Sequence, residues 1–158
     1  MQLILGRHNL DLVQNQFAKG CVLSIGNFDG VHLGHQHILR AVVTQAQKMK
    51  LPSVVMLFEP LPVEFFSPQE APVRLMNFRE KVKALQSSGI DYVLCVRFNE
   101  AFARLSAEQF VQTILVNQLH IQHLVVGDDF HFGLQRQGDF KYLQQTGVRF
   151  GFSVTDMP

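Results

Sequence analysis

The fold of this chain can be read outward from residues 26–35, whose sequence is G-N-F-D-G-V-H-L-G-H. The five residues before this segment, C-V-L-S-I, form a short apolar run, which is the pattern of a buried strand. After the segment, apolar residues recur with helical spacing at Ile38, Leu39, Val42, Val43, Ala46 and Met49. We therefore expect a strand at residues 21–26 and a helix at residues 35–50, joined by a loop that carries three glycines and two histidines.

This loop is a candidate phosphate site. The N–H groups at the start of a helix attract anions, and glycine lets the backbone approach such a ligand closely. Imidazole rings can bond phosphate oxygens. The loop contains neither G-x-x-x-x-G-K-[ST] nor G-x-G-x-x-G, so His32 and His35 stand in place of a P-loop lysine. The chemistry implied is attack on the α-phosphate of a nucleotide with pyrophosphate leaving, which requires alignment and charge stabilisation.

Two other interpretations of these histidines remain open at this point. A single histidine is commonly a hydrogen-bonded surface or core residue. A zinc site built from His32, His35 and His37 is the other alternative, but no Cys, His or carboxylate set at ligand spacing accompanies it.

The composition is that of one soluble globular domain. The chain has 158 residues, of which 47% are apolar and 17% charged, and its net charge of +1 argues against a large nucleic-acid surface. No apolar run reaches the ~20 residues of a membrane span, and no signal peptide is present. Cys21 and Cys95 lie in apolar runs and fit buried free thiols in a reducing cytoplasm, with a disulfide between them as the alternative.

Strand and helix patterns alternate along the chain. We expect about five main strands, at residues 21–26, 54–58, 92–96, 123–127 and 148–154, a short edge strand at 3–5, and helices at 35–50, 78–88, from Ser106 onward, and at 140–146. Residues 60–75 contain four prolines and are expected to be irregular. The alternation predicts an α/β fold, a doubly wound parallel sheet with helices on both faces. The loops at 26–35, 59–75 and 127–138 would then meet at the carboxyl edge of the sheet, where such folds bind ligands.

The other loops contribute further candidates. Asp128 and Asp129 offer oxygen ligands to a hard cation, or alternatively cap their own turn. Arg136 could pair with phosphate or hold its loop. Aromatic side chains could stack on a flat ring or simply pack in the core; they are Phe58, Phe65, Phe66 and Phe78. Arg74 and Lys81 are expected to be solvated.

The first loop, G-x-F-D-G-x-H-x-G-H, resembles the nucleotidylyltransferase superfamily, whose H-x-G-H loop lies on a Rossmann-like fold. Further motifs follow in order: F-E-P-L-P at 58–62, R-L at 74–75 before E-K at 80–81, and G-D-D-F-H-F-G at 127–133 with Arg136 and Gly138. Together they are similar to the N-terminal FMN adenylyltransferase module of the bacterial bifunctional riboflavin kinase/FAD synthetases, over nearly the whole chain.

This resemblance implies a reaction in which ATP and FMN give FAD and pyrophosphate, with Mg²⁺. It implies that His32 and His35 are catalytic and hold the ATP phosphates. Gly26, Phe28, Gly30 and Gly34 would shape the nucleotide pocket, Asp129 would face the phosphates or the metal, and Phe58 and Pro60 would border the flavin. Arg136 is a further candidate for substrate binding.

The resemblance also bears on domain organisation. The family continues with an I-S-S-T-x-I-R-like segment and a riboflavin kinase domain, and neither is matched within residues 1–158. We therefore expect residues 1–158 to be the nucleotidylyltransferase domain of a longer enzyme, without its C-terminal segment and covalently linked to a kinase domain. The alternatives are a related nucleotidylyltransferase with another nucleotide or phosphate acceptor, and a flavin- or nucleotide-binding fragment without turnover.

Overall fold

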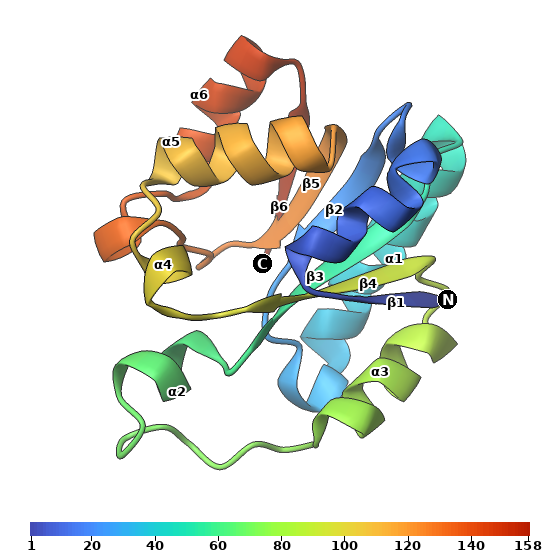
Figure 1. The fold of residues 1–158 in the computed structure, drawn as a ribbon. Coiled ribbons are helices and arrows are strands. Elements are labelled where there is room, and N and C mark those ends of the chain that lie inside the picture. Colours follow the sequence, from blue (N-terminus) through green and yellow to red (C-terminus); the bar gives the residue numbers. More distant parts are fainter.

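A single parallel sheet of six strands organises the computed structural model, which describes residues 1–158 (Figure 1). The strands are β1 Gln2–Leu5, β2 Cys21–Ile25, β3 Ser53–Glu59, β4 Tyr92–Arg97, β5 Ile121–Gly127 and β6 Ser153–Met157. The α-helices are α1 Leu33–Met49, α2 Pro62–Phe66, α3 Phe78–Ser87, α4 Glu100–Ala103, α5 Ala107–Gln109 and α6 Phe140–Phe150. Tighter or wider turns of helix are η1 Arg7–Phe17, η2 Asp29–Val31, η3 Phe110–Gln118 and η4 Leu134–Arg136.

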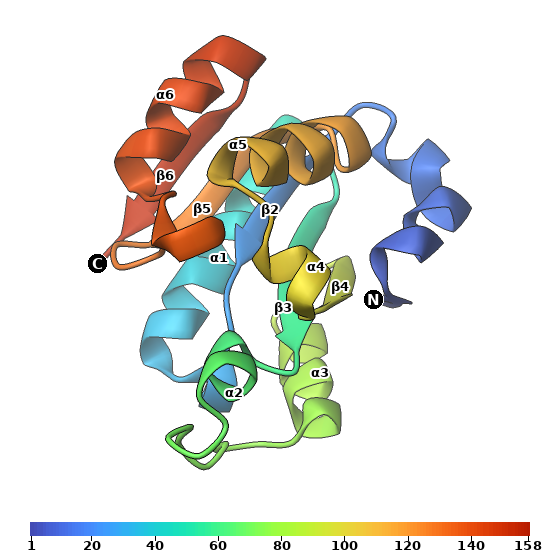
Figure 2. The same ribbon diagram turned by 60° about the vertical axis from the view of Figure 1, so that its left-hand side comes forward.

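The strand order is β1-β4-β3-β2-β5-β6. The side of the sheet on which successive strands are added changes at β2. From β2 the chain moves outward to β3 and β4 by way of α1 and α3, and then returns to the other side of β2 to form β5 and β6. Because parallel crossovers are right-handed, the reversal sends the later helices to the opposite face. Helices α1 and α3 therefore cover one face, while η1, η3 and α6 cover the other (Figures 1 and 2).

The core consists of two apolar layers separated by the sheet. Alternate residues of β2 enter different layers: Leu23 and Ile25 join the larger cluster under η1 and η3, whereas Val22 joins the cluster under α1. All five residues of β2 are buried, because helices pack on both faces of the sheet. Cys21 and Cys95 are both buried free thiols, so the disulfide alternative is wrong.

The fold class is confirmed, with differences in detail. The edge strand at residues 2–5 pairs with β4, which brings the sheet to six strands rather than about five. The strand expected at 148–154 is misplaced. Helix α6 continues to Phe150, Val148 lies on its solvent face with 89% of its surface exposed, and Gly151 ends the helix at φ +86°. The segment 60–75 is not wholly irregular, since Pro62 begins the short helix α2 at a position where proline is favoured.

Candidate active site

A cavity of about 760 Å³ lies at the carboxyl ends of β2, β3 and β5. Its walls come from the β2–α1 loop, the end of β3 with α2, the segment after β4, and the loop after β5. This is the point where strand order reverses, so the loops after β2 and β5 diverge to opposite faces and leave a crevice between them. The three loops singled out in the sequence all reach this cavity.

His32 and His35 form a reciprocal cap at the start of α1. The backbone N–H of His35 donates to Nδ1 of His32 at 3.4 Å, and the backbone N–H of His32 donates to Nδ1 of His35 at 3.3 Å. Two histidines thus fill the roles that Ser and Glu take in an ordinary capping box. Their rings stack with centroids 3.5 Å apart.

This cap decides which ring nitrogen carries the hydrogen. Because Nδ1 of each ring accepts a backbone N–H, the hydrogen of each neutral ring must be on Nε2. Burial lowers the pKa of His35 to about 4, with the neighbouring His32 acting in the same direction. At neutral pH His35 is therefore an uncharged donor at the edge of the cavity, beside the N-terminus of a helix.

The loop after β5 forms the opposite wall. Phe132 and Gly138 exchange two backbone hydrogen bonds, of 3.1 and 2.8 Å, which close the loop into a narrow turn. A side chain at Gly138 would overlap the ring of Phe132, so this close approach requires glycine. The turn presents Asp128, Asp129 and Arg136 to the cavity.

One side of the cavity is strongly aromatic. Phe58 contacts Phe98 edge-on and Phe102 at a tilt, with ring centroids 5.7 and 5.5 Å apart. Other phenylalanines continue this lining, namely Phe66, Phe110, Phe130 and Phe132. Phe65 packs behind Phe66 and Phe98, and Phe78, the first residue of α3, packs against the core layer on the far face of the sheet. Of the four phenylalanines named as stacking candidates, the cavity is therefore lined by Phe58 and Phe66.

Most of the residues selected from the sequence come together in this cavity. Those that line it are Gly26, Phe28, His32, Gly34, His35, Phe58, Asp129 and Arg136. Gly30 and Pro60 are not among its lining residues. Gly30 has a φ of +79° and lies against the Leu75 side chain, and Pro60 is exposed.

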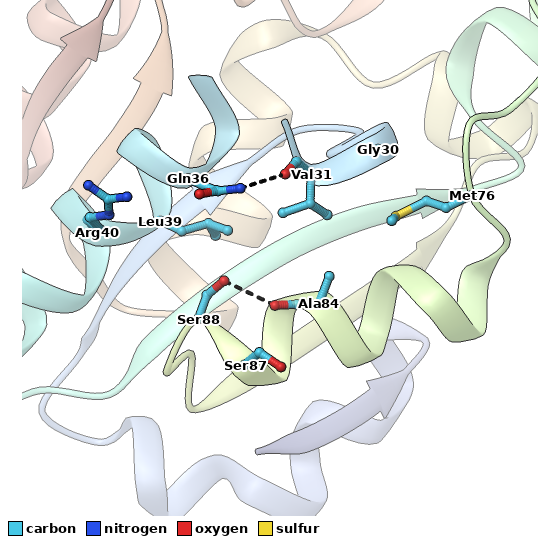
Figure 3. A pocket seen from close by; sticks show the side chains of 9 residues that line it. All are labelled: Gly30, Val31, Gln36, Leu39, Arg40, Met76, Ala84, Ser87 and Ser88. Atoms are coloured by element: carbon cyan, nitrogen blue, oxygen red, sulfur yellow. Dashed lines mark hydrogen bonds between the residues drawn. The ribbon is translucent and has the colours of Figure 1, made fainter. Parts of the chain in front are cut away.

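Gly30 instead lines a second cavity, between α1 and α3 (Figure 3). Two of the polar groups drawn there are already used within the chain: the Gln36 side chain donates to the Val31 carbonyl, and the Ser88 hydroxyl donates to the Ala84 carbonyl. Arg40 is the only charged side chain of the lining. This cavity lies on one helical face rather than at the strand ends, so we do not assign the chemistry to it.

Three charged residues near the site have roles that the sequence reading missed. Asp29 accepts the backbone N–H groups of Leu75 and Met76 at 2.9–3.2 Å and so ties the first loop to the segment before α3. Arg74 is not free in solvent, since it binds the carboxylates of Glu59 and Glu64.

Lys81 is the third, with only 1% of its surface exposed. Burial lowers its pKa, while the nearby Glu59 and Asp29 oppose that shift. A signal was present in the sequence, because Lys81 and Leu85 are four residues apart and must share one face of a helix.

The carboxylates of the cavity fit a magnesium ion better than a zinc ion. No group of three or more His, Cys, Asp or Glu side chains is placed to hold a metal, which leaves the zinc alternative at His32, His35 and His37 without a ligand set. Mg²⁺ requires fewer protein ligands, because it is commonly held by one or two carboxylates together with substrate phosphates. Asp129, on the cavity wall, offers such a carboxylate.

Fold and site together define a doubly wound α/β protein with a candidate anion site at its switch point. The chain belongs to the FAD synthetase family, whose model matches residues 14–158. It is 50% identical over 98% of its length to the bifunctional riboflavin kinase/FMN adenylyltransferase of Escherichia coli (strain K12), and 51% identical over 98% to that of Pseudomonas fluorescens.

The chain spans about half the length of these relatives, 49% and 48%. Among solved structures it is similar to a protein described as a macrolide-efflux protein from Streptococcus pneumoniae. The TM-score is 0.77 and the identity 28%, over 88% of this chain and 45% of the other. No helix has the length and apolar character needed to cross a membrane.

Proposed function

We propose that this chain transfers AMP from ATP to FMN, giving FAD and pyrophosphate. The observation that carries the proposal is the reciprocal cap of His32 and His35, which leaves two Nε2–H donors beside a helix N-terminus and next to an aromatic cavity. Names of the relatives, bifunctional riboflavin kinase/FMN adenylyltransferase, agree with this reaction.

The histidine end of the cavity takes the ATP phosphates in this proposal. The Nε2–H groups of the two rings and the N–H groups of α1 stabilise charge that develops on the α-phosphate as pyrophosphate leaves. Gly26, Phe28 and Gly34 shape the nucleotide pocket, and Arg136 pairs with phosphate oxygens. In this role His32 and His35 act as hydrogen-bond donors through Nε2, and neither has to transfer a proton.

The aromatic side takes the flavin. An isoalloxazine ring is flat and largely apolar, and Phe58 and Phe66 offer faces and edges of the kind that such rings pack against. Asp129 would hold Mg²⁺ together with the substrate phosphates, and the ion would neutralise charge on the triphosphate. With the two substrates on adjoining walls, the phosphate of FMN can meet the α-phosphate of ATP between them.

The domain assignment is part of the same proposal. Residues 1–158 are the nucleotidylyltransferase domain, and a riboflavin kinase domain belongs to the same polypeptide. This is supported by the relatives, which are about twice as long and are named for both activities.

A direct assay tests the proposal. The full-length protein is incubated with FMN, ATP and Mg²⁺, and FAD and pyrophosphate are measured together by chromatography and a coupled assay. FAD and pyrophosphate in equal amounts are expected. Turnover with CTP or with another phosphate acceptor, without FAD, would establish the alternative nucleotidylyltransferase. Binding of FMN without any pyrophosphate release would establish a binding fragment.

A further inference from the structure

Helix α2 forms a wall of the cavity and is only partly held by apolar packing, in which Phe65 and Phe66 contact Phe98. It contributes Pro62, Val63 and Phe66 to the lining, and none of its five residues is buried. Figures 1 and 2 show it standing away from the sheet, beyond the end of β3. An isolated helix of this length is not stable in water, so contacts from elsewhere must fix it.

Arg74 adds polar contacts from outside the helix. Its Nη1 and Nη2 donate to the two oxygens of Glu59 at 2.8 Å each, and its Nε donates to Glu64 at 2.8 Å. A second bond from Nη2 to Glu64 makes this pair bidentate as well. Glu59 ends β3 and Glu64 lies in α2, so one guanidinium joins the strand to the helix.

The geometry of this pairing makes it stronger than an ordinary surface ion pair. The side chains of Arg74, Glu59 and Glu64 are 25%, 30% and 25% exposed. Bidentate hydrogen bonds from one guanidinium to each carboxylate fix the orientation of the groups as well as their distance. The hydrogen bonds from Arg74 lower the pKa of Glu64 to about 2. Glu64 also accepts the N–H of Leu61 at 2.8 Å, at the start of α2.

The backbone that follows Arg74 is itself held in place. Asp29, in the first loop, accepts the N–H groups of the two residues that follow Arg74. The segment from Arg74 to Met76 therefore links three walls of the cavity: the histidine loop through the backbone bonds to Asp29, the end of β3 through Arg74 and Glu59, and α2 through Arg74 and Glu64. It does not itself line the cavity.

We propose that Arg74 is a positioning residue, which holds α2 against the flavin by clamping Glu64 to Glu59. The identity of the ligand, FMN, rests on the proposed function. The clamp itself does not. Since α2 borders the aromatic side of the cavity and the histidines border the other, loosening α2 will weaken the acceptor site more than the ATP site.

Steady-state kinetics of the full-length protein test this. Loss of a positioning contact can cost about ten- to a hundredfold, so Arg74→Ala is expected to raise KM for FMN about tenfold and KM for ATP less than about twofold. Arg74→Lys keeps the charge but loses the bidentate hydrogen bonds. Its KM for FMN should lie between that of Arg74→Ala and that of the unaltered protein. The control is Arg149→Ala, which breaks the exposed pair with Glu108 and should change neither constant.

A cycle with Glu64→Gln, which keeps an oxygen acceptor for the Leu61 N–H, shows whether Arg74 acts through Glu64. Residues that work as one unit are non-additive, so adding Glu64→Gln to Arg74→Ala should raise KM for FMN no further. Full additivity of the two changes would overturn the clamp. An equal rise in both KM values, or no rise in either, would overturn the acceptor-side role.

Amide hydrogen exchange keeps the clamp testable if no FAD forms. Exchange of residues 61–67 should become faster in Arg74→Ala than in Arg149→Ala, while exchange in β2 stays the same. Unchanged exchange at 61–67 would overturn the clamp. Absence of FAD from the unaltered protein would instead refute the proposed function, and the exchange result would still decide whether Arg74 holds α2.

Discussion

His32 and His35 cap helix α1 for each other, each ring accepting the backbone N–H of the other residue while the two rings stack. The same two side chains therefore hold the helix start and present donors to the cavity. A substitution can separate these two roles, because the cap uses Nδ1 and the proposed phosphate contact would use Nε2.

His32→Asn tests this separation. Asparagine is a good N-cap, so helix α1 should keep its start and the melting temperature should change little. FAD formation should nevertheless fall about a hundredfold, as expected for loss of one donor to a developing charge. His32→Ala should show the same loss of activity and a further destabilisation of about 1 kcal/mol. Normal turnover by His32→Asn would show that the imidazole contacts no phosphate.

The protonation of His35 gives a pH prediction. Its folded pKa is lowered to about 4, mainly by burial, whereas an unfolded histidine has a pKa near 6.5. Between these values the unfolded chain binds more protons, so this residue's contribution to stability is complete above pH 6.5 and is lost as the pH falls toward 4.

A histidine NMR titration checks this value. The ring signals of His35 should stay at their neutral positions from pH 8 down to about 5 and shift near pH 4. The comparison is the His35→Gln variant, which identifies the signal by its disappearance. A midpoint near 6.5 would contradict the neutral donor.

Asp29 should matter for stability although it lies in a motif that resembles a catalytic loop. Asp29→Ala removes a carboxylate that accepts N–H groups from Leu75 and Met76, and hydrogen bonds to charged groups contribute about 1.5–3 kcal/mol. We expect a loss of this order in urea unfolding. Asp11→Ala, at an exposed position on η1, is the control and should stay within about 0.5 kcal/mol.

Two buried serines in neighbouring strands should respond in opposite ways. The Ser24 hydroxyl is buried without a hydrogen-bond partner, so Ser24→Ala should be neutral or stabilise by up to about 1 kcal/mol. The Ser53 hydroxyl donates to the Asp91 carboxylate and accepts the Asp91 N–H, so Ser53→Ala should destabilise by about 1–3 kcal/mol. Thermal unfolding of both variants measures the contrast. Equal effects of the two substitutions on stability would show that the Ser24 hydroxyl has a hydrogen-bond partner.

Local sequence patterns predicted most of the fold because strand and helix signals are short-range. The helix expected from Ser106 onward is present, and the capping box of Ser106 with Gln109 begins it. The last strand was misplaced because apolar residues alternate with other residues from Val148 to Val154, which is the pattern of a strand, although α6 continues to Phe150. Only the positive φ at Gly151, together with pairing of Val154 to Leu124, decides where the helix stops and the strand begins.

The sequence by itself determined the strand–loop–helix order and the chemistry of the H-x-G-H loop, since both depend on residues close together in the chain. Only the tertiary structure decided which loop residues face the cavity. It left Gly30 out of the cavity lining and placed Arg74 and Lys81 among carboxylates from three separate segments. The burial and pairing of a charge depend on partners distant in sequence, and the local patterns on which sequence reading rests do not contain them.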